Sequence, residues 1–239
     1  MMKLAVDLRR SAFAPLLALA AGCASGQLAA PVGTPVADPA PFAAQLVAGS
    51  LPTSPQQINF GWTLAEGGSR VRGMGVVRVE APRRIRLDLF GMRGETYLMA
   101  ALVDGEFRLP SAARAAIALP SPALLWGALG VVQPPQDGVL GTANETSTGA
   151  ELRYATADET FVYSFTRTSQ SGYHLTTLER AASRGVLETI NITRGPDGAI
   201  AQTSYRDWEA FRDLTFEIET VQGAASFPQS VWNPDAPTP

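Results

Sequence analysis

The sequence holds one cysteine, Cys23, and one histidine, His174, and these two set the limits of its reactive chemistry. A lone cysteine excludes an intrachain disulfide and a thiolate metal cluster. His174 lies in a segment with strand-like alternation, and no G-x-S-x-G or H-E-x-x-H motif supplies it with partners for nucleophile activation or metal binding. We therefore expect a protein that is not an enzyme, with no cofactor and no metal site.

Glycines and pairs of acidic residues elsewhere in the chain also lack the spacing of a phosphate-binding or metal-binding motif. Gly73-Met74-Gly75 is followed by no helix and no third glycine, so it does not form a phosphate loop, and we expect these glycines to permit bending of a strand. The pairs Asp207/Glu209 and Glu217/Glu219 lack the spacing of a metal-binding loop. With 19 basic and 22 acidic residues, the net charge of −3 gives no reason to expect nucleic-acid binding.

Arginines are concentrated in one stretch of this acidic chain. Alternation places Arg70, Arg72 and Arg78 on one face of a strand, and Arg84 and Arg86 on another face of the next strand. Arginine binds phosphate and carboxylate groups through two parallel hydrogen bonds, so these five are candidates for contact with lipid headgroups or an acidic partner. The alternative is a solvated convex sheet face with cross-strand pairs to Glu80 and Asp88.

Cys23 lies at the end of a leader. Residues 1–10 carry three basic residues, Ser11–Ala21 is apolar but too short to span a bilayer, and small residues follow up to the cysteine. This pattern resembles the bacterial lipobox, in which the cysteine receives a diacylglycerol thioether, although Ala20 stands where leucine is preferred and Leu19 lies one position further out. We predict a lipoprotein signal peptide over residues 1–22 and lipidation of Cys23, with palmitate among the acyl groups. The alternative is an ordinary secretory peptide with a chance cysteine.

The predicted anchor also implies a location. Ala24 follows the cysteine where an aspartate would favour retention in the inner membrane, which resembles an outer-membrane address on the periplasmic face. Removal of three basic and one acidic residue with the leader leaves 16 basic and 21 acidic residues, a charge of −5. Residues 23–41 are rich in Ala, Gly and Pro and predict a flexible tether. No apolar run after the leader is long enough for a transmembrane helix.

The remainder alternates with the period of β-strands. A short helix is predicted over 42–51, ended by Gly49 and Pro52. Strands are predicted over 57–64, 70–79, 84–89, 96–103, 106–109, 151–154, 160–167, 173–179, 186–194, 199–205 and 214–221. Between them, 111–132 predicts one or two apolar helices, with Ser121 as N-cap and Pro122 at the first helical position.

These elements predict a single domain over 42–233 with a tail at 234–239. Short turns such as Asp104-Gly105 and Gly195-Pro196-Asp197-Gly198 join neighbouring strands, which indicates an antiparallel meander. A content of 46% hydrophobic and 17% charged residues suits a chain with a sizeable apolar core. We predict a mainly β (α+β) fold: about ten strands in a strongly curved antiparallel sheet or half-open β-barrel, with a helical lid across its open side.

Three stretches of the sequence resemble the LolA/LolB lipoprotein-carrier superfamily and its outer-membrane lipoprotein relatives. They are 75–104 (GVVRVEAPRRIRLDLFGMRGETYLMAALVD), the apolar helical insertion 122–132, and the closing run 205–228 (YRDWEAFRDLTFEIETVQGAASFP). The resemblance implies a half-open barrel whose concave face, covered by helices, forms an apolar cavity for the acyl chains of lipoproteins.

The resemblance also implies which side chains meet an acyl chain. The cavity residues would be Phe60, Trp62, Leu87, Leu89, Leu98 and Leu102, and the lid residues Leu124, Leu125, Trp126 and Leu129. For each of them, plain core packing is the alternative. LolB also has an exposed apolar loop that inserts lipoproteins into the membrane, whereas the turn at 91–94 is short and offers only Met92, which does not favour that activity.

The function expected from the leader and the resemblance is a lipid-anchored periplasmic binding protein. It would hold acyl chains of a lipid or lipoprotein in an apolar cavity, in lipoprotein or lipid trafficking at the outer membrane. The alternative is a structural or assembly lipoprotein that uses the same fold to dock a protein partner. An open apolar cavity favours the first function, whereas a filled interior with a functional arginine face favours the second.

Overall fold

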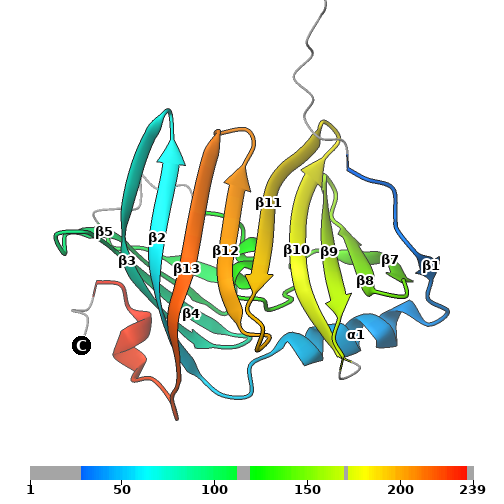
Figure 1. Cartoon of the computed structure of the whole chain (residues 1–239), viewed down its shortest axis with the longest axis horizontal. Coiled ribbons are helices and arrows are strands. Elements are labelled where there is room, and N and C mark those ends of the chain that lie inside the picture. Colours follow the sequence, from blue (N-terminus) through cyan, green and yellow to red (C-terminus); the bar gives the residue numbers. More distant parts are fainter. Residues whose placement is uncertain (1–27, 112–118, 170–171, 236–239) are drawn as a thin grey trace, which may run out of the picture.

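The computed structural model describes residues 28–111, 119–169 and 172–235, and within them one antiparallel sheet of thirteen strands carries the architecture (Figure 1). The sheet order is β1-β7-β8-β9-β10-β11-β12-β13-β2-β3-β4-β5-β6. The strands are β1 Thr34–Pro35, β2 Gln56–Glu66, β3 Ser69–Glu80, β4 Arg84–Gly91, β5 Thr96–Val103, β6 Glu106–Arg108, β7 Val139–Glu145, β8 Gly149–Ala155, β9 Glu159–Arg167, β10 Tyr173–Ala182, β11 Gly185–Arg194, β12 Ile200–Asp207 and β13 Arg212–Gly223.

The sheet is a curved half-barrel, as predicted. Strands β2, β3 and β10–β13 stand side by side in Figure 1, while β4 and β5 on one side and β7 and β8 on the other pass behind them. The edge strands β1 and β6 do not pair with each other, so the barrel is open. Two helices, α1 Pro39–Ser50 and α2 Pro122–Ala128, accompany the sheet, and a short 3-10 helix, η1 Gln229–Trp232, lies near the C-terminus.

Helix α2 covers the middle of the concave face. Ser121 and Pro122 take the predicted N-cap and first helical positions, although the Ser121 hydroxyl makes no capping hydrogen bond. Leu124 and Trp126 are 0% and 2% exposed, and they belong to the two apolar clusters that lie under β8–β12 and under β2–β5. The helix is apolar over most of its surface because it is surrounded by the sheet. No helix in the described part of the chain is long and apolar enough to cross a membrane.

A strand and the start of α1 precede Phe42, the first residue of the domain predicted from the sequence. Residues 34–41 fall within the predicted tether, yet Thr34 and Pro35 pair with β7, and α1 already begins at Pro39. The backbone N–H of Val36 donates to the carbonyl oxygen of Ala143 over 2.9 Å. An edge strand offers unpaired backbone groups to any extended segment, whatever its side chains, so composition alone did not reveal this pairing.

Close approach of strands explains the glycines at positions 73 and 75. A Cβ on Gly73 would lie 1.9 Å from the Phe90 carbonyl oxygen, and one on Gly75 would lie 2.5 Å from the Phe60 ring. The Trp62 indole N–H donates to the carbonyl oxygens of Met74 and Phe90 over 3.0 and 3.1 Å, directly beside this contact. The absence of side chains at these two glycines thus lets the rings of Trp62 and Phe60 approach the backbone of β3 closely.

Substitution Gly73→Ala tests this contact. We expect it to lower the free energy of unfolding by at least about 2 kcal/mol, because the added methyl group meets a backbone oxygen that cannot move independently. Urea unfolding of the full chain measures the change. Gly61→Ala on β2 is the control, since a Cβ there lies 3.7 Å from its nearest neighbour. Equal effects of the two substitutions would contradict the steric explanation.

Candidate functional site

The concave face contains an apolar pocket of about 240 Å³ beside α2, here called the α2 pocket. It is enclosed by β2, β4, β5, β11, β12 and β13 together with one side of the helix. Its lining side chains are almost all hydrocarbon or aromatic: Trp62, Leu64, Leu87, Leu89, Tyr97, Leu98, Ala100, Phe107, Leu119, Pro120, Leu124, Leu125, Ala128, Ile190, Tyr205, Leu214 and Phe216, with Glu66 and Arg212 in addition. The pocket is therefore suited to hydrocarbon.

Six of the ten residues assigned to the cavity and lid meet in this pocket. They are Trp62, Leu87, Leu89, Leu98, Leu124 and Leu125. Phe60 and Leu102 point to the same side of the sheet but lie in the packed core, 3% and 0% exposed. Trp126 packs in that core and borders a separate hollow near Pro134. Leu129 lines a different pocket beyond the end of α2.

The far wall of the pocket consists of residues that the sequence analysis did not assign to it. Ile190, Tyr205, Leu214 and Phe216 come from β11, β12 and β13. Alternation places Phe216 on the inward face, which is the only signal that the sequence carries for this wall. Strand β13 pairs with β2, with Phe216 opposite Trp62, and this pairing joins the two halves of the sheet. Only the observed register shows the pairing.

Polar groups around the α2 pocket are bonded to one another. Arg212 and Glu66 form an ion pair over 2.6 Å at its rim. The Tyr205 hydroxyl donates to the Glu188 carboxylate. Burial, and after it the hydrogen bond to Glu188, raises the pKa of Tyr205 well above its ordinary value, so the phenol stays neutral and protonated. Because these polar groups already have hydrogen-bond partners, a ligand in the pocket does not need to supply any.

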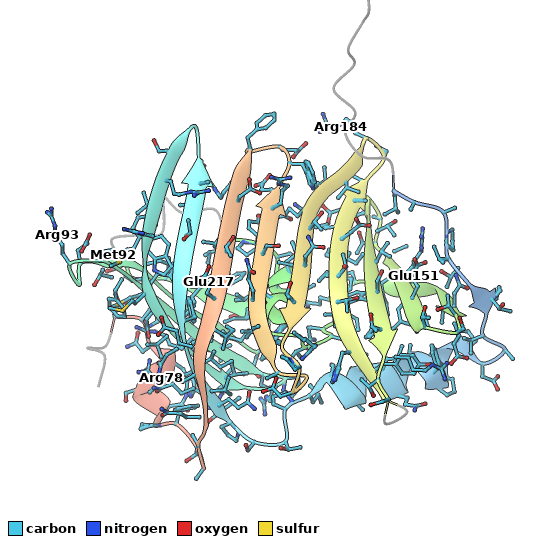
Figure 2. All side chains as sticks on the ribbon, in the orientation of Figure 1. Arg78, Met92, Arg93, Glu151, Arg184 and Glu217 are labelled. Atoms are coloured by element: carbon cyan, nitrogen blue, oxygen red, sulfur yellow. The ribbon has the colours of Figure 1, made fainter. Side chains whose placement is uncertain are left out.

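The arginines are arranged differently from the prediction. Arg78 lies directly opposite Arg86 in the β3–β4 register, so the two share one face of the sheet, and the prediction of different faces was wrong. Asp88, fully buried, accepts from Arg78 over 3.0 Å and from Arg86 over 2.6 Å. Arg84 contacts Glu80 over 3.5 Å. Figure 2 labels Arg78, which also donates to the Gln57 side chain over 3.2 Å.

The C-terminal segment covers this face of the sheet, so the face is not simply solvated. Val231 and Trp232 of η1 pack against Ala101 and Val103 of β5. The Val231 carbonyl oxygen accepts from Arg86 over 3.3 Å. Arg78, Arg84 and Arg86 are thus engaged by other groups of the protein, with Arg84 also donating to Gln229.

Two predicted anion contacts remain exposed. Arg70 and Arg72, near the start of β3, have exposed side chains and form no ion pair within the described residues. Met92, 60% exposed, and Arg93 project from the β4–β5 turn away from the body of the sheet (Figure 2).

Cys23, the predicted lipidation site, lies outside the described residues. Within those residues, no group of three or more His, Cys, Asp or Glu side chains is placed to hold a metal ion.

Comparison with solved structures identifies the architecture. The LolA superfamily protein NE2245 from Nitrosomonas europaea aligns over 80% of this chain and 97% of its own, with a TM-score of 0.57 and 9% identity. A putative outer membrane lipoprotein-sorting protein domain from Vibrio parahaemolyticus aligns over 82% and 96%, with a TM-score of 0.53 and 6% identity. No protein-family model and no curated protein matches the sequence. The chain has a LolA-like fold, which confirms the resemblance at the level of architecture.

The buried ionic cluster makes a testable prediction. Asp88→Asn leaves the buried Arg86 and the mostly buried Arg78 without their shared carboxylate, and we expect a loss of about 3–5 kcal/mol in the free energy of unfolding. Urea unfolding provides the measurement. Asp104→Asn is the control, because Asp104 pairs with Arg83 over 2.8 Å at the exposed β5–β6 turn, where water screens the interaction, and it should cost far less. A loss for Asp88→Asn no larger than for the control would refute the role of the cluster.

Proposed function

We propose that this protein is a lipid-anchored periplasmic binding protein that holds acyl chains of a lipid or lipoprotein in the α2 pocket. The observation that carries the proposal is this apolar pocket on the concave face, lined by six of the side chains expected from the LolA/LolB resemblance. The likeness of fold to a LolA superfamily protein and to a lipoprotein-sorting domain supports it. Its role would lie in lipoprotein or lipid trafficking at the outer membrane.

The arrangement of the arginines favours lipid binding over protein docking. A docking lipoprotein was expected to have a filled interior and a functional arginine face. Here the concave side retains an apolar pocket, whereas Arg78, Arg84 and Arg86 are occupied by Asp88, Glu80 and the C-terminal segment. A protein partner therefore has fewer free charges to recognise on this face than the sequence indicated.

Filling the α2 pocket provides the first test. Leu125→Trp places a larger ring in the cavity from a half-buried helix position. Displacing about two methylene groups of a ligand, at ~0.8 kcal/mol each, weakens binding roughly tenfold. The measurement is crosslinking of the full chain to a photoactivatable palmitoyl phospholipid, with the labelled peptides mapped by mass spectrometry.

Val139→Trp is the matched control, since it adds the same ring at a position that is 71% exposed on β7. Labelling of peptides from β2, β4, β5 and α2 that falls in Leu125→Trp but not in Val139→Trp supports the proposal. Crosslinking that is absent, or that is equally strong in both variants, counts against an acyl ligand in this pocket.

The anchor has its own test. Because the thioether forms on the cysteine sulfur, Cys23→Ser should abolish incorporation of labelled palmitate by cells that express the chain. The neighbouring substitution Ser25→Ala should leave incorporation unchanged. Mass spectrometry of the N-terminal peptide identifies the modification and the cleavage position. Labelling that persists in Cys23→Ser would exclude this cysteine as the site of attachment.

A further inference from the structure

A second pocket, of about 330 Å³, lies beyond the C-terminal end of α2 and is here called the Arg194 pocket. It is bounded by the segments that follow α1 and α2 and by strand ends that lie along the lower edge of the sheet in Figure 1. Its apolar wall includes Leu51, Ile58, Val79, Leu175, Ile200 and Ile218. Ala128 lines both pockets, so the end of α2 is the partition between them.

One residue of this mostly apolar lining, Arg194, carries a positive charge. Arg194 follows the buried residues Ile190 and Ile192 at every second position of β11, and so lies on the inward face of the sheet. Its Nη1 donates to the Gly198 carbonyl oxygen over 2.9 Å, but its Nε is buried and has no hydrogen-bond partner. No ion pair to Arg194 is found in the described part of the chain, and the nearby Asp197 carboxylate instead accepts from the Ala199 backbone N–H.

A guanidinium group with a buried N–H that has no acceptor destabilises the folded protein when no ligand is bound. Arginine keeps its charge and presents five N–H donors, and a buried donor without an acceptor loses the full hydration of that group. Burial lowers the pKa of Arg194, which reports the same penalty on its charged form. Elsewhere in this protein the buried arginine Arg86 has a carboxylate partner, so the missing acceptor at Arg194 calls for an explanation.

The pocket itself, with a volume of about 330 Å³, has room for an acceptor from outside. Gly130, at a φ of +74°, forms a close side of it, since a Cβ built there would lie 2.9 Å from Cδ1 of Ile200 and 3.1 Å from Nη2 of Arg194. His174 lines the same pocket, and burial together with the Arg194 charge lowers its pKa, so its ring is neutral and has one N–H to donate. The pocket thus combines a hydrocarbon wall with donors for an oxyanion.

We propose that the Arg194 pocket binds the anionic headgroup of an amphiphilic lipid, a carboxylate or a phosphate, with the guanidinium of Arg194 as the principal contact and the attached hydrocarbon against the apolar wall. Arginine matches the geometry of both oxyanions. The inference rests on the proposed function in that the ligand is a lipid, but it adds a selection for charge and assigns it to a different pocket.

The test compares ligands that differ only in the headgroup. Binding of palmitate, palmitoyl lysophosphatidic acid and the neutral cetyl alcohol to the full chain is measured by competition against photoactivatable palmitate. We expect at least one of the two anionic lipids to bind about tenfold or more tightly than the alcohol, and Arg194→Gln to abolish that difference, since hydrogen bonds to a charged group are among the strongest. Arg70→Gln, which removes an exposed arginine of the outer face, controls for net charge and should keep the preference.

Stability separates a binding role from a structural one. Without ligand, Arg194→Gln should unfold at the same or a higher urea concentration than the wild type, because it removes a half-buried charge that has no carboxylate partner and whose Nε lacks an acceptor. A lower midpoint together with an unchanged headgroup preference would overturn the proposal, as would inorganic phosphate alone competing as well as the phosphate-bearing lipid. Binding of both anionic lipids no tighter than that of the alcohol would overturn this inference and leave acyl binding intact, whereas failure of every lipid to bind would refute the proposed function itself.

Discussion

A strongly curved sheet has a concave apolar face that must be covered, and the rest of this structure depends on how α2 covers it. The helix has seven residues, so it reaches only across the middle of the face. The Thr203 hydroxyl donates to the Ala128 carbonyl oxygen over 2.9 Å and fixes the end of the helix against β12. Gly127 lies close against Leu178, where a Cβ would come within 2.6 Å of that side chain. A helix held so tightly in the centre leaves hollows on both sides of it.

The outer side of the sheet stabilises the wall of the α2 pocket. Alternation along β4 places Leu87 and Leu89 toward the pocket, while Arg86 and Asp88, which alternate with them in sequence, face outward. The buried Arg78–Asp88–Arg86 cluster and the C-terminal segment over it therefore restrain the same strand that supplies the lining. The ionic cluster is thus a structural feature of this wall, which explains why arginines that looked available for a ligand are not.

Local patterns in the sequence predicted most of the elements. The Asp104-Gly105 hairpin was predicted, and both residues have positive φ, 52° and 90°. Gly198 likewise closes its predicted turn at a φ of 81°. Strand β7 was missed because Val139–Glu145 (VLGTANE) carries little alternation, and β1 because two residues of a proline-rich segment have no pattern of their own. Both strands form because a neighbouring strand provides backbone hydrogen bonds to them.

The candidate site was harder to predict than the fold, because it depends on contacts between distant segments. Besides Asp88, Arg86 has an acceptor in the Val231 carbonyl oxygen, 145 residues away, and no local pattern connects these two residues. Tyr205, Leu214 and Phe216 enter the α2 pocket only because β13 closes onto β2. The unpaired state of Arg194 is likewise a property of the assembled pocket, since arginines at strand ends are ordinarily solvated.

The two pockets divide the recognition of a lipid between them on physical grounds. In the α2 pocket the Glu66–Arg212 and Tyr205–Glu188 contacts satisfy the polar groups internally, so that pocket can distinguish ligands only by shape and hydrocarbon content. A group whose hydrogen bonds are already made contributes little to specificity, whereas a buried donor that lacks an acceptor penalises every ligand that fails to supply one. Selection by headgroup in this protein therefore has its physical basis at Arg194, beyond the C-terminal end of α2, which separates it from the pocket proposed to hold the acyl chain.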